Sequence, residues 1–456
     1  MPDNLTFASV ALLKEVSKAF RQLSLSPEDR LLQFSPPPGD RRQVSLYRRG
    51  TARVRVEETE VSAGNRRATL MDADSAIVQI ANPTAFKARF PSATMIGRGT
   101  FVVHFRSLDS KVAAFGDDLN YLNLLRDFLA GQGFPDLKIE PNLYLDAPEL
   151  KKATFAQQAA IGQWNMGPSA NGGIERDEAH GVSKGNATIV VAVIDSEIRR
   201  DHVALASAKV LPQLEVTDSN APTGAKTNWH GTACASVIVA QGNEDLLGVA
   251  PGCTLLPIKV PFPPTMEDLA KGFELAREGG AKIVSLSYAT PQRSESFRKL
   301  LEDNGNILVI VAAGNDDADL AVTPLYPASF TLPNIISVVA SDQGGALVKF
   351  SNYAATDAAH LAAPGADVRA CDIEDSSDTA TMTGTSIAAP HVAGVAALLW
   401  SISPEASPAS IKQWILESVT TISVLSVCCR TGGFLNAARA ARRAAGLPMN
   451  QAPIPA

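Results

Sequence analysis

Ser386 has the clearest potential for chemistry of any residue in this chain. It lies in a stretch of small residues, Gly384-Thr385-Ser386-Ile387-Ala388-Ala389, that leads into a small and apolar segment, 392–400. That segment predicts a helix buried in the centre of a domain. Small neighbours would let a substrate backbone approach, and the free N–H groups at the beginning of a helix favour a developing oxyanion beside the serine. Taken alone, the stretch also fits a core helix that Ser386 merely caps.

Two further residues could activate the Ser386 hydroxyl. Asp195 follows the β-branched run 188–194, and His230 opens the sequence His230-Gly231-Thr232 before another apolar segment. A serine hydroxyl is a weak nucleophile until an imidazole accepts its proton, and the imidazole needs a carboxylate that fixes its tautomer and stabilises its charged form. An α/β-hydrolase would carry Ser, acid and His in that order around a G-x-S-x-G turn, which residues 384–388 do not supply.

A parallel sheet would bring these residues together. From residue 188 onward, continuous apolar runs alternate with stretches of helical spacing, which indicates a parallel sheet covered on both faces. Chemistry in such sheets gathers at the carboxyl ends of strands, where Asp195 and Asn315 both lie. The predicted strands are 188–194, 255–260, 282–286, 307–312 and 335–339, and the predicted helices are 234–239, 266–278 and 294–303.

The first 150 residues show a different pattern. Residues 100–105 and 137–145 have strand character and 119–130 has helical spacing, which predicts a small α+β unit. Before it, residues 1–23 could form an amphipathic helix, and 44–61 alternate like strands with a solvated arginine face.

The composition limits the classes of function. The 456 residues allow two or three domains, and the net charge of −6 argues against a nucleic-acid partner. No apolar run reaches the length of about 18 residues that a membrane span needs. Asp3 stands where a secretory signal carries positive charge, so we expect a cytoplasmic protein, with non-classical secretion left open. The five cysteines fit no zinc site and should be reduced thiols, although the adjacent Cys428 and Cys429 could form a disulfide.

Residues 160–441 resemble the subtilase (subtilisin-like, S8) family of serine endopeptidases, in which acid, histidine and serine follow in that order. The blocks that carry the resemblance are Val191-Ala192-Val193-Ile194-Asp195-Ser196, His230-Gly231-Thr232, Gly248-Val249-Ala250-Pro251, Val311-Ala312-Ala313-Gly314-Asn315, Tyr326-Pro327-Ala328, Phe350-Ser351-Asn352-Tyr353, Ala363-Pro364-Gly365, residues 384–394 and Gly433-Phe434-Leu435-Asn436-Ala437.

The resemblance implies a role for each site residue. Ser386 matches the nucleophile, His230 the general base and Asp195 the acid that orients it. Asn315 matches the side-chain donor of the oxyanion hole, and the backbone N–H of Ser386 is the second donor. His391, His202 and His360 are expected to be structural.

The resemblance also indicates where a substrate would bind. Ser287, Tyr288 and Ala289 look like the family's substrate-pairing edge, with Gly314 nearby in the oxyanion motif. Leu325 stands where the family often has Gly at the floor of the first specificity pocket, and Ala289 also replaces a Gly. These two larger residues predict a shallow pocket that favours a small or medium apolar residue on the acyl side of the cut.

Four positions depart from the family pattern without altering a catalytic residue. Glu197 replaces a Gly after the acid and is expected to point into solvent. Ala233 replaces a second His, Ile387 replaces the Met beside the nucleophile, and Cys234 resembles the cysteine of the proteinase K and thermitase branches. We therefore expect an active enzyme.

The resemblance implies an α/β fold, a subtilisin-like doubly wound parallel sheet with helices on both faces, preceded by a smaller α+β propeptide-like domain. Ile139-Glu140-Pro141-Asn142 is similar to the end of such propeptides, and Gln163-Trp164-Asn165 to the start of a mature catalytic domain. We expect the unit to inhibit in cis and to be cut between about 146 and 163. The predicted divisions are an extension of unknown role (1–95), the propeptide-like domain (96–150), a polar linker (151–170), the catalytic domain (171–445) and a tail (446–456).

These observations predict a serine endopeptidase that acts on protein or peptide substrates and needs no cofactor for its chemistry. Two alternatives stay open: a processing protease dedicated to one peptide precursor, and a non-hydrolytic module that holds peptides in the cleft. A structural calcium is a further expectation, because the loop 241–247 offers Asn243, Glu244 and Asp245 as oxygen ligands.

Overall fold

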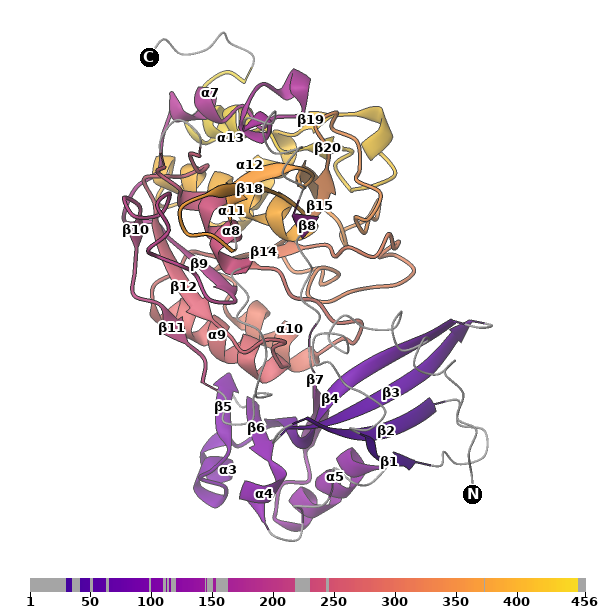
Figure 1. Ribbon diagram of the computed structural model, residues 1–456. Coiled ribbons are helices and arrows are strands. Elements are labelled where there is room, and N and C mark those ends of the chain that lie inside the picture. The colour runs from indigo at the N-terminus through magenta and orange to yellow at the C-terminus, as the bar shows by residue number, and fades with distance from the viewer. Residues whose placement is uncertain are drawn as a thin grey trace.

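The computed structural model describes residues 30–34, 42–49, 52–62, 65–97, 100–109, 112, 115, 120–143, 145, 151–152, 163–217, 230–242, 246–372 and 374–449. The helix predicted at 1–23, most of the predicted linker, the proposed calcium ligands Asn243, Glu244 and Asp245, and the end of the tail lie outside these residues. Figure 1 shows two domains, a smaller one from the N-terminal part of the chain and a larger α/β domain above it.

The smaller domain is built on an antiparallel sheet with the order β1-β2-β3-β4-β6-β5, in which β7 also pairs with β4. Helices α3 (Pro83–Arg89), α4 (Phe105–Leu108) and α5 (Tyr121–Gly131) accompany it. The predicted α+β character is therefore confirmed. The strands are β1 (Arg30–Phe34), β2 (Arg42–Arg49), β3 (Ala52–Ser62), β4 (Asn65–Ile80), β5 (Thr94–Gly97), β6 (Thr100–His104) and β7 (Leu137–Leu143).

The division that the sequence suggests at residue 95 falls within this sheet. Residues 95 and 96 are neighbours inside β5, and β4 pairs with both β6 and β7. The described part of 1–95 thus shares one sheet with 96–143. The alternating pattern at 44–61, which appears as β2 and β3, predicts strands, but it carries no information about which partners these strands pair with.

The larger domain contains a ten-stranded sheet with the order β10-β12-β9-β13-β14-β15-β16-β20-β19, in which β11 also pairs with β12. Neighbouring strands are parallel except β19 and β20. The strands are β9 (Val190–Asp195), β10 (Lys209–Val210), β11 (Leu214–Glu215), β12 (Thr254–Lys259), β13 (Ile283–Leu286), β14 (Leu308–Ala312), β15 (Ile335–Ser341), β16 (Leu361–Pro364), β19 (Thr420–Thr421) and β20 (Gly433–Phe434).

Alternate side chains of this sheet face two different cores. Val191 and Val193 pack in one apolar cluster with α8 (His230–Val239) and α11 (Thr385–Ile402), whereas Ala192 and Ile194 pack in a second with α9 (Met266–Glu278) and α10 (Glu295–Asp303). Because successive strand residues point to opposite faces, a continuous apolar run is what a sheet covered on both sides requires. The predicted doubly wound architecture is confirmed. Short helices α7 (Arg176–His180), α12 (Pro408–Glu417) and α13 (Ala437–Ala444) complete the domain.

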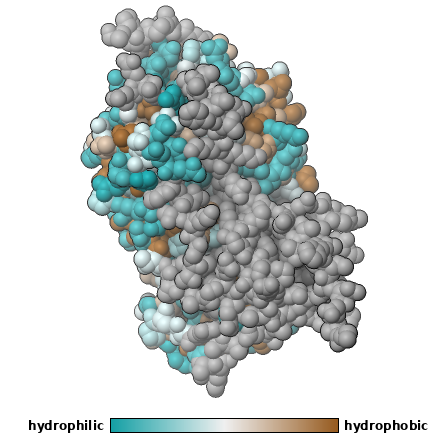
Figure 2. All heavy atoms as spheres, in the orientation of Figure 1, coloured by the Kyte–Doolittle hydropathy of each residue, from teal (hydrophilic) through white to brown (hydrophobic). Residues whose placement is uncertain are grey.

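Helix α11 is the central helix that the sequence predicts. Every residue from Thr385 to Trp400 is buried, and Pro390 lies in its second turn. It is the helix of the described chain that has the length and composition to cross a membrane, yet 89% of it is buried inside the protein, as in a core helix. The coloured part of the surface in Figure 2 is mostly hydrophilic, with hydrophobic side chains scattered over it.

A small second sheet joins the predicted linker to the catalytic domain. Strand β18 (Thr379–Thr383) pairs antiparallel with β17 (Val368–Cys371) on one side and with β8 (Lys151–Lys152) on the other. The linker therefore begins with a short strand, and its other described end contains the 3₁₀ helices Trp164–Met166 and Ser169–Asn171.

Candidate active site

Four elements of the larger domain carry the polar residues that the sequence singles out. Asp195 is the last residue of β9, and His230 is the first residue of α8. Asn315 follows the carboxyl end of β14, and Ser386 is the second residue of α11. Asp195 and Asn315 thus lie at the same edge of the parallel sheet, because the carboxyl ends of parallel strands meet there.

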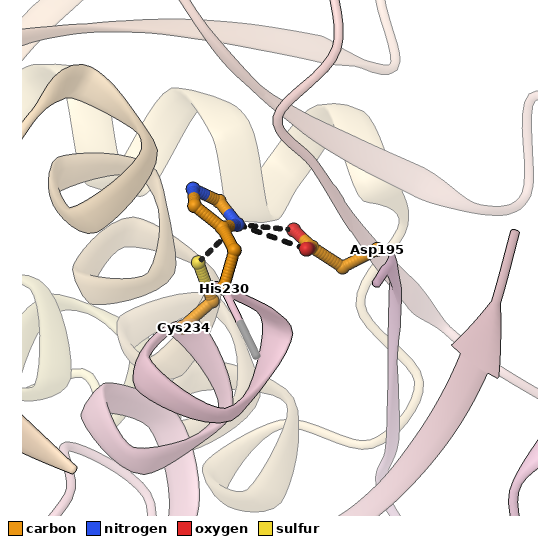
Figure 3. A group of neighbouring side chains, drawn as sticks. All are labelled: Asp195, His230 and Cys234. Atoms are coloured by element: carbon orange, nitrogen blue, oxygen red, sulfur yellow. Dashed lines mark hydrogen bonds and ion pairs between the residues drawn. The ribbon is translucent and has the colours of Figure 1, made fainter. Parts of the chain in front are cut away.

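Asp195 and His230 are in direct contact. Nδ1 of His230 lies 2.8 Å from Oδ1 and 2.9 Å from Oδ2 of Asp195, and both side chains are buried (Figure 3). A carboxylate at Nδ1 leaves Nε2 as the nitrogen that can exchange a proton with a hydroxyl. Gly231 makes the close approach feasible, because a Cβ there would lie 2.8 Å from the carbonyl oxygen of Ser196 and 3.1 Å from Cβ of Asp195.

The surroundings of His230 favour its charged form. Burial lowers the pKa of the imidazole, but its interactions with Asp195 and Cys234 raise it, and the pKa of His230 is held well above its ordinary value. The carboxylate of Asp195 also accepts a hydrogen bond of 2.7 Å from the backbone N–H of Ser196. Asp195 therefore stabilises an imidazolium, which is the state that a general base reaches after it accepts a proton.

Cys234 connects the base to the serine. Its Sγ lies 3.7 Å from Nδ1 of His230, one helical turn earlier, and donates a hydrogen bond of 3.3 Å to the carbonyl oxygen of Ser386. Burial raises the pKa of the Cys234 thiol, which keeps it a donor. Ser386 is fully buried, and its Oγ has no hydrogen-bond partner among the described residues. The structure therefore shows no hydrogen bond between Oγ of Ser386 and His230.

Thr385 fixes the orientation of the Asn315 amide. Oδ1 of Asn315 accepts hydrogen bonds from the backbone N–H of Thr385 at 2.9 Å and from its Oγ1 at 2.7 Å. Nδ2 of Asn315 is buried and has no hydrogen-bond partner among the described residues. Its oxygen is thus held by the residue next to Ser386, and the amide keeps an unused donor.

Gly314 and Leu325 lie against each other. A Cβ on Gly314 would be 3.0 Å from Cδ1 of Leu325, and the φ of Gly314 is +99°, a left-handed conformation that favours glycine. The candidate substrate edge Ser287, Tyr288 and Ala289 follows β13 and is buried. The hydroxyl of Tyr288 has no hydrogen-bond partner among the described residues, and burial raises its pKa well above the ordinary value.

His391, His360 and Glu197 make contacts that are typical of structural residues. His391 is buried with Nδ1 2.9 Å from the carbonyl oxygen of Ile387, and Nδ1 of His360 accepts from the backbone N–H of Ser337. Glu197 is one-third exposed, with its carboxylate 3.5 Å from Nζ of Lys259. All five cysteines are free.

The described end of the loop 241–247 is hydrogen-bonded to Arg176 and Gln163. The carbonyl oxygen of Leu247 accepts hydrogen bonds from Nη1 of Arg176 at 2.8 Å and from Nε2 of Gln163 at 3.1 Å. Oε1 of Gln163 accepts from the same Nη1 at 3.1 Å. A guanidinium charge thus lies at this end of the loop, and its charge opposes a second cation beside it. The predicted ligands Asn243, Glu244 and Asp245 lie outside the described residues.

Several contributing residues are not assigned a role by sequence reasoning. Thr385 and Asn352 are part of recognised blocks, but nothing in the sequence says that they hold Asn315. Asp195, His230 and Cys234 lie close enough to form a metal-binding group by distance alone. In this structure Nδ1 of His230 is instead hydrogen-bonded to the carboxylate of Asp195.

Comparison with known proteins agrees with this geometry. The sequence profile of the Subtilase family matches residues 186–440. The chain is 29% identical over 333 residues to an alkaline protease of Alkalihalobacillus alcalophilus, covering 70% of this chain and 82% of that one. It is 32% identical over 227 residues to subtilisin Savinase of Lederbergia lenta, covering 48% and 80%.

Two solved structures share the fold. The structure of the prenylagaramide maturation protease PagA is 29% identical, with a TM-score of 0.51 over 60% of this chain and 99% of that one. A protease from Pseudoalteromonas arctica has a TM-score of 0.54 at 23% identity, over 62% and 97% of the two chains. The chain belongs to the subtilase family and is a subtilisin-like serine protease.

Proposed function

We propose that the protein cleaves peptide bonds through Asp195, His230 and Ser386, with Asn315 as the side-chain donor of the oxyanion hole. The observation that carries this proposal is the Asp195–His230 hydrogen bond, together with Cys234, which contacts both His230 and the backbone of Ser386. The unused Nδ2 donor of Asn315 supports the fourth role.

Each group then has a defined task. Nε2 of His230 accepts the proton of Ser386 as Oγ attacks the carbonyl carbon of the substrate. The oxyanion that forms accepts hydrogen bonds from Nδ2 of Asn315 and the backbone N–H of Ser386. The imidazolium, stabilised by Asp195, gives its proton to the leaving amine, and an acyl group stays on Oγ. A water molecule then attacks the acyl carbon while His230 accepts its proton. The imidazolium returns a proton to Oγ of Ser386, and the acid is released.

Hydrolysis of an unstructured protein substrate tests the assignment. Wild type is expected to cleave it, whereas Ser386→Ala and His230→Ala should show no detectable cleavage. Ser401→Ala is the matched control, because Ser401 lies on the same helix and its hydroxyl donates to the carbonyl oxygen of Ala397, away from the site. Equal activity of wild type and Ser386→Ala would refute the proposed function.

The N-terminal domain is proposed to inhibit the site in cis, and its contacts with two helices support this. The Glu140 carboxylate accepts from Ser294 Oγ at 2.7 Å and from the backbone N–H groups of Glu295 and Ser296 at 3.0 and 3.1 Å, at the beginning of α10. Oδ1 of Asn142 accepts at 3.1 Å from the backbone N–H of Glu267, at the beginning of α9. Both side chains satisfy helix N–H groups that would otherwise lack partners.

The chain that leaves this domain is held on the catalytic domain at two points. Leu145 is buried, and its N–H donates at 2.8 Å to the carbonyl oxygen of Pro264. Lys151 and Lys152 pair with β18, which ends at Thr383, shortly before Ser386. We propose that the bond cut during maturation lies within 146–150, the segment between these two points.

The intact masses of wild type and Ser386→Ala test self-cleavage. Wild type should yield a fragment that begins within 147–151, and Ser386→Ala should stay full length. Identical intact masses would contradict self-cleavage. A wild-type fragment that begins near 163 would place the cut outside the proposed segment.

A second candidate function is maturation of one peptide precursor. The similarity to the prenylagaramide maturation protease PagA favours this alternative. A panel of unrelated unfolded proteins separates the two. A general protease should cleave most of them, whereas a dedicated enzyme should leave them intact.

A further inference from the structure

Both polar atoms of the Asn352 side chain form hydrogen bonds with the loop that carries Asn315. It is fully buried, and Nδ2 donates a hydrogen bond of 2.9 Å to the carbonyl oxygen of Ala313. Its Oδ1 accepts from the backbone N–H groups of Asp316 at 2.9 Å and Ala318 at 3.0 Å. Asn352 is thus hydrogen-bonded to the backbone both before and after Asn315.

The backbone around Asn352 reinforces the same loop. Its N–H donates to the carbonyl oxygen of Gly314 at 3.0 Å, and the carbonyl oxygen of Phe350 accepts from the N–H of Asp317 at 2.8 Å. A Cβ on Gly314 would lie 2.4 Å from Nδ2 of Asn352, so the two residues are in close contact. The Asn315 loop is thus held by a segment that is distant in the sequence.

The loop needs support from outside itself. Gly314 and Asp317 both have left-handed backbone conformations, with φ of +99° and +54°, and for the non-glycine Asp317 this conformation is energetically unfavourable. Asn352 binds the residues on both sides of Asn315, and Thr385 binds its side-chain oxygen. The position of Nδ2 therefore depends on two supports, one for the backbone and one for the amide.

We infer that Asn352 is a positioning residue of the oxyanion hole, which holds the Asn315 backbone so that Nδ2 is in place before the oxyanion forms. This inference rests on the proposed function. Donors that are already oriented stabilise a transition state without a cost of reorganisation. A displacement of about 1 Å in a catalytic group can cost about 10²-fold in rate. Asn352 does not touch substrate in this account and acts only through Asn315.

Asn352→Ala should lower kcat of the processed enzyme about tenfold, with KM unchanged, because the loop shifts and the substrate edge does not. The assay uses a short peptide amide, with active sites counted by fluorophosphonate titration. Asn334→Ala is the matched control: Asn334 is equally buried, and its Nδ2 donates to the carbonyl oxygens of Leu301 and Ile307, away from the site. It should lower stability and leave kcat within about twofold of wild type.

A double-mutant cycle with Asn315→Ala separates positioning from a general structural role. If Asn352 acts through Asn315, Asn352→Ala should change kcat by less than about twofold once Asn315 is already Ala. An equal loss in both backgrounds, or no loss in wild type, would overturn the inference. An inactive wild type, or an Asn315→Ala variant as active as wild type, would instead count against the proposed function.

Asn352→Asp gives a second route if the alanine variant does not fold. The shape is kept and an oxygen still accepts from Asp316 and Ala318, but a second oxygen now faces the carbonyl of Ala313. We expect a soluble protein with a several-fold lower kcat, and no further loss in the Asn315→Ala background. A full-sized loss in that background would likewise contradict the inference.

Discussion

His104 of the N-terminal domain and Glu267 of the catalytic domain meet at the interface between the two domains. Nε2 of His104 lies 3.5 Å from Oε2 of Glu267, whose other oxygen is 2.6 Å from Nζ of Lys271 on the same helix. Asp72 on β4 contributes a further negative charge, and Nδ2 of Asn142 lies 3.4 Å from Oε2 of Glu267. The hydrogen bond and charge of Glu267 raise the pKa of His104 against the opposing effects of burial and Lys271.

This pair predicts that the stability of the interface between the two domains depends on pH. A raised pKa in the joined state means that protonation of His104 stabilises the interface fully below the ordinary pKa of 6.5, and that this stabilisation is lost as the pH rises through the raised value. The pKa of Glu267 is lowered, so its contribution exists above its ordinary 4.5 and is lost at more acidic pH. The interface should be tightest between these values and weaken toward alkaline pH.

Thermal unfolding of full-length Ser386→Ala, which cannot cut itself, measures the effect. His104→Gln in this background should lower Tm by a few degrees near pH 6, for a part-buried ion pair of about 1 kcal/mol, and should have little effect near pH 9. His180→Gln is the control, since His180 contacts the carbonyl oxygen of Val249 within the catalytic domain. A Tm difference that is constant or grows with pH would exclude the His104 contribution.

Leu325→Gly should widen the specificity pocket. The Leu325 side chain lies against Gly314, so its removal opens space next to the loop that carries Asn315. The ratio of kcat/KM for substrates with Phe against Ala on the acyl side should rise by about 10- to 100-fold. A peptide library compares the variant with wild type and with Val322→Ala, whose side chain is exposed nearby. A wild-type profile already dominated by Phe, Tyr or Arg would refute the shallow pocket.

Arg176 should stabilise the loop 241–247 without calcium. Arg176→Ala leaves the carbonyl oxygen of the half-buried Leu247 with one donor fewer, and the loss of a hydrogen bond from a charged group should lower Tm by about 5 °C. Arg277→Ala, which removes a half-exposed ion pair with Glu274, should change Tm by about 1 °C at most. Addition of EDTA should leave the Tm of wild type unchanged, and a clear fall on chelation would show that a metal stabilises the protein.

The sequence predicts the catalytic domain well because its signals are local. The run 188–194 is apolar throughout, as a strand buried on both faces must be, and it appears as β9 with Asp195 at its end. The small and apolar residues after Ser386 likewise predict a buried helix, because a helix that is apolar on all sides belongs in a protein interior.

Contacts between distant segments could not be predicted in the same way. The partners of Asn352 lie 34 to 39 residues earlier in the chain, and they are backbone groups that no residue pattern identifies. The pairing of β4 with β6 and β7 depends on the packing of the whole N-terminal domain. His104 and Glu267 come from different domains, so neither residue alone indicates the other.

The most direct test of the account is peptide mapping by mass spectrometry after reaction with a fluorophosphonate. The processed wild type should carry one phosphonyl group, on the peptide that contains Ser386, because the proposed mechanism has His230 activate this hydroxyl. His230→Ala should carry none at the same exposure, while Ser401→Ala should react like wild type. Modification of another serine, or undiminished labelling of His230→Ala, would contradict the assignment of Asp195, His230 and Ser386.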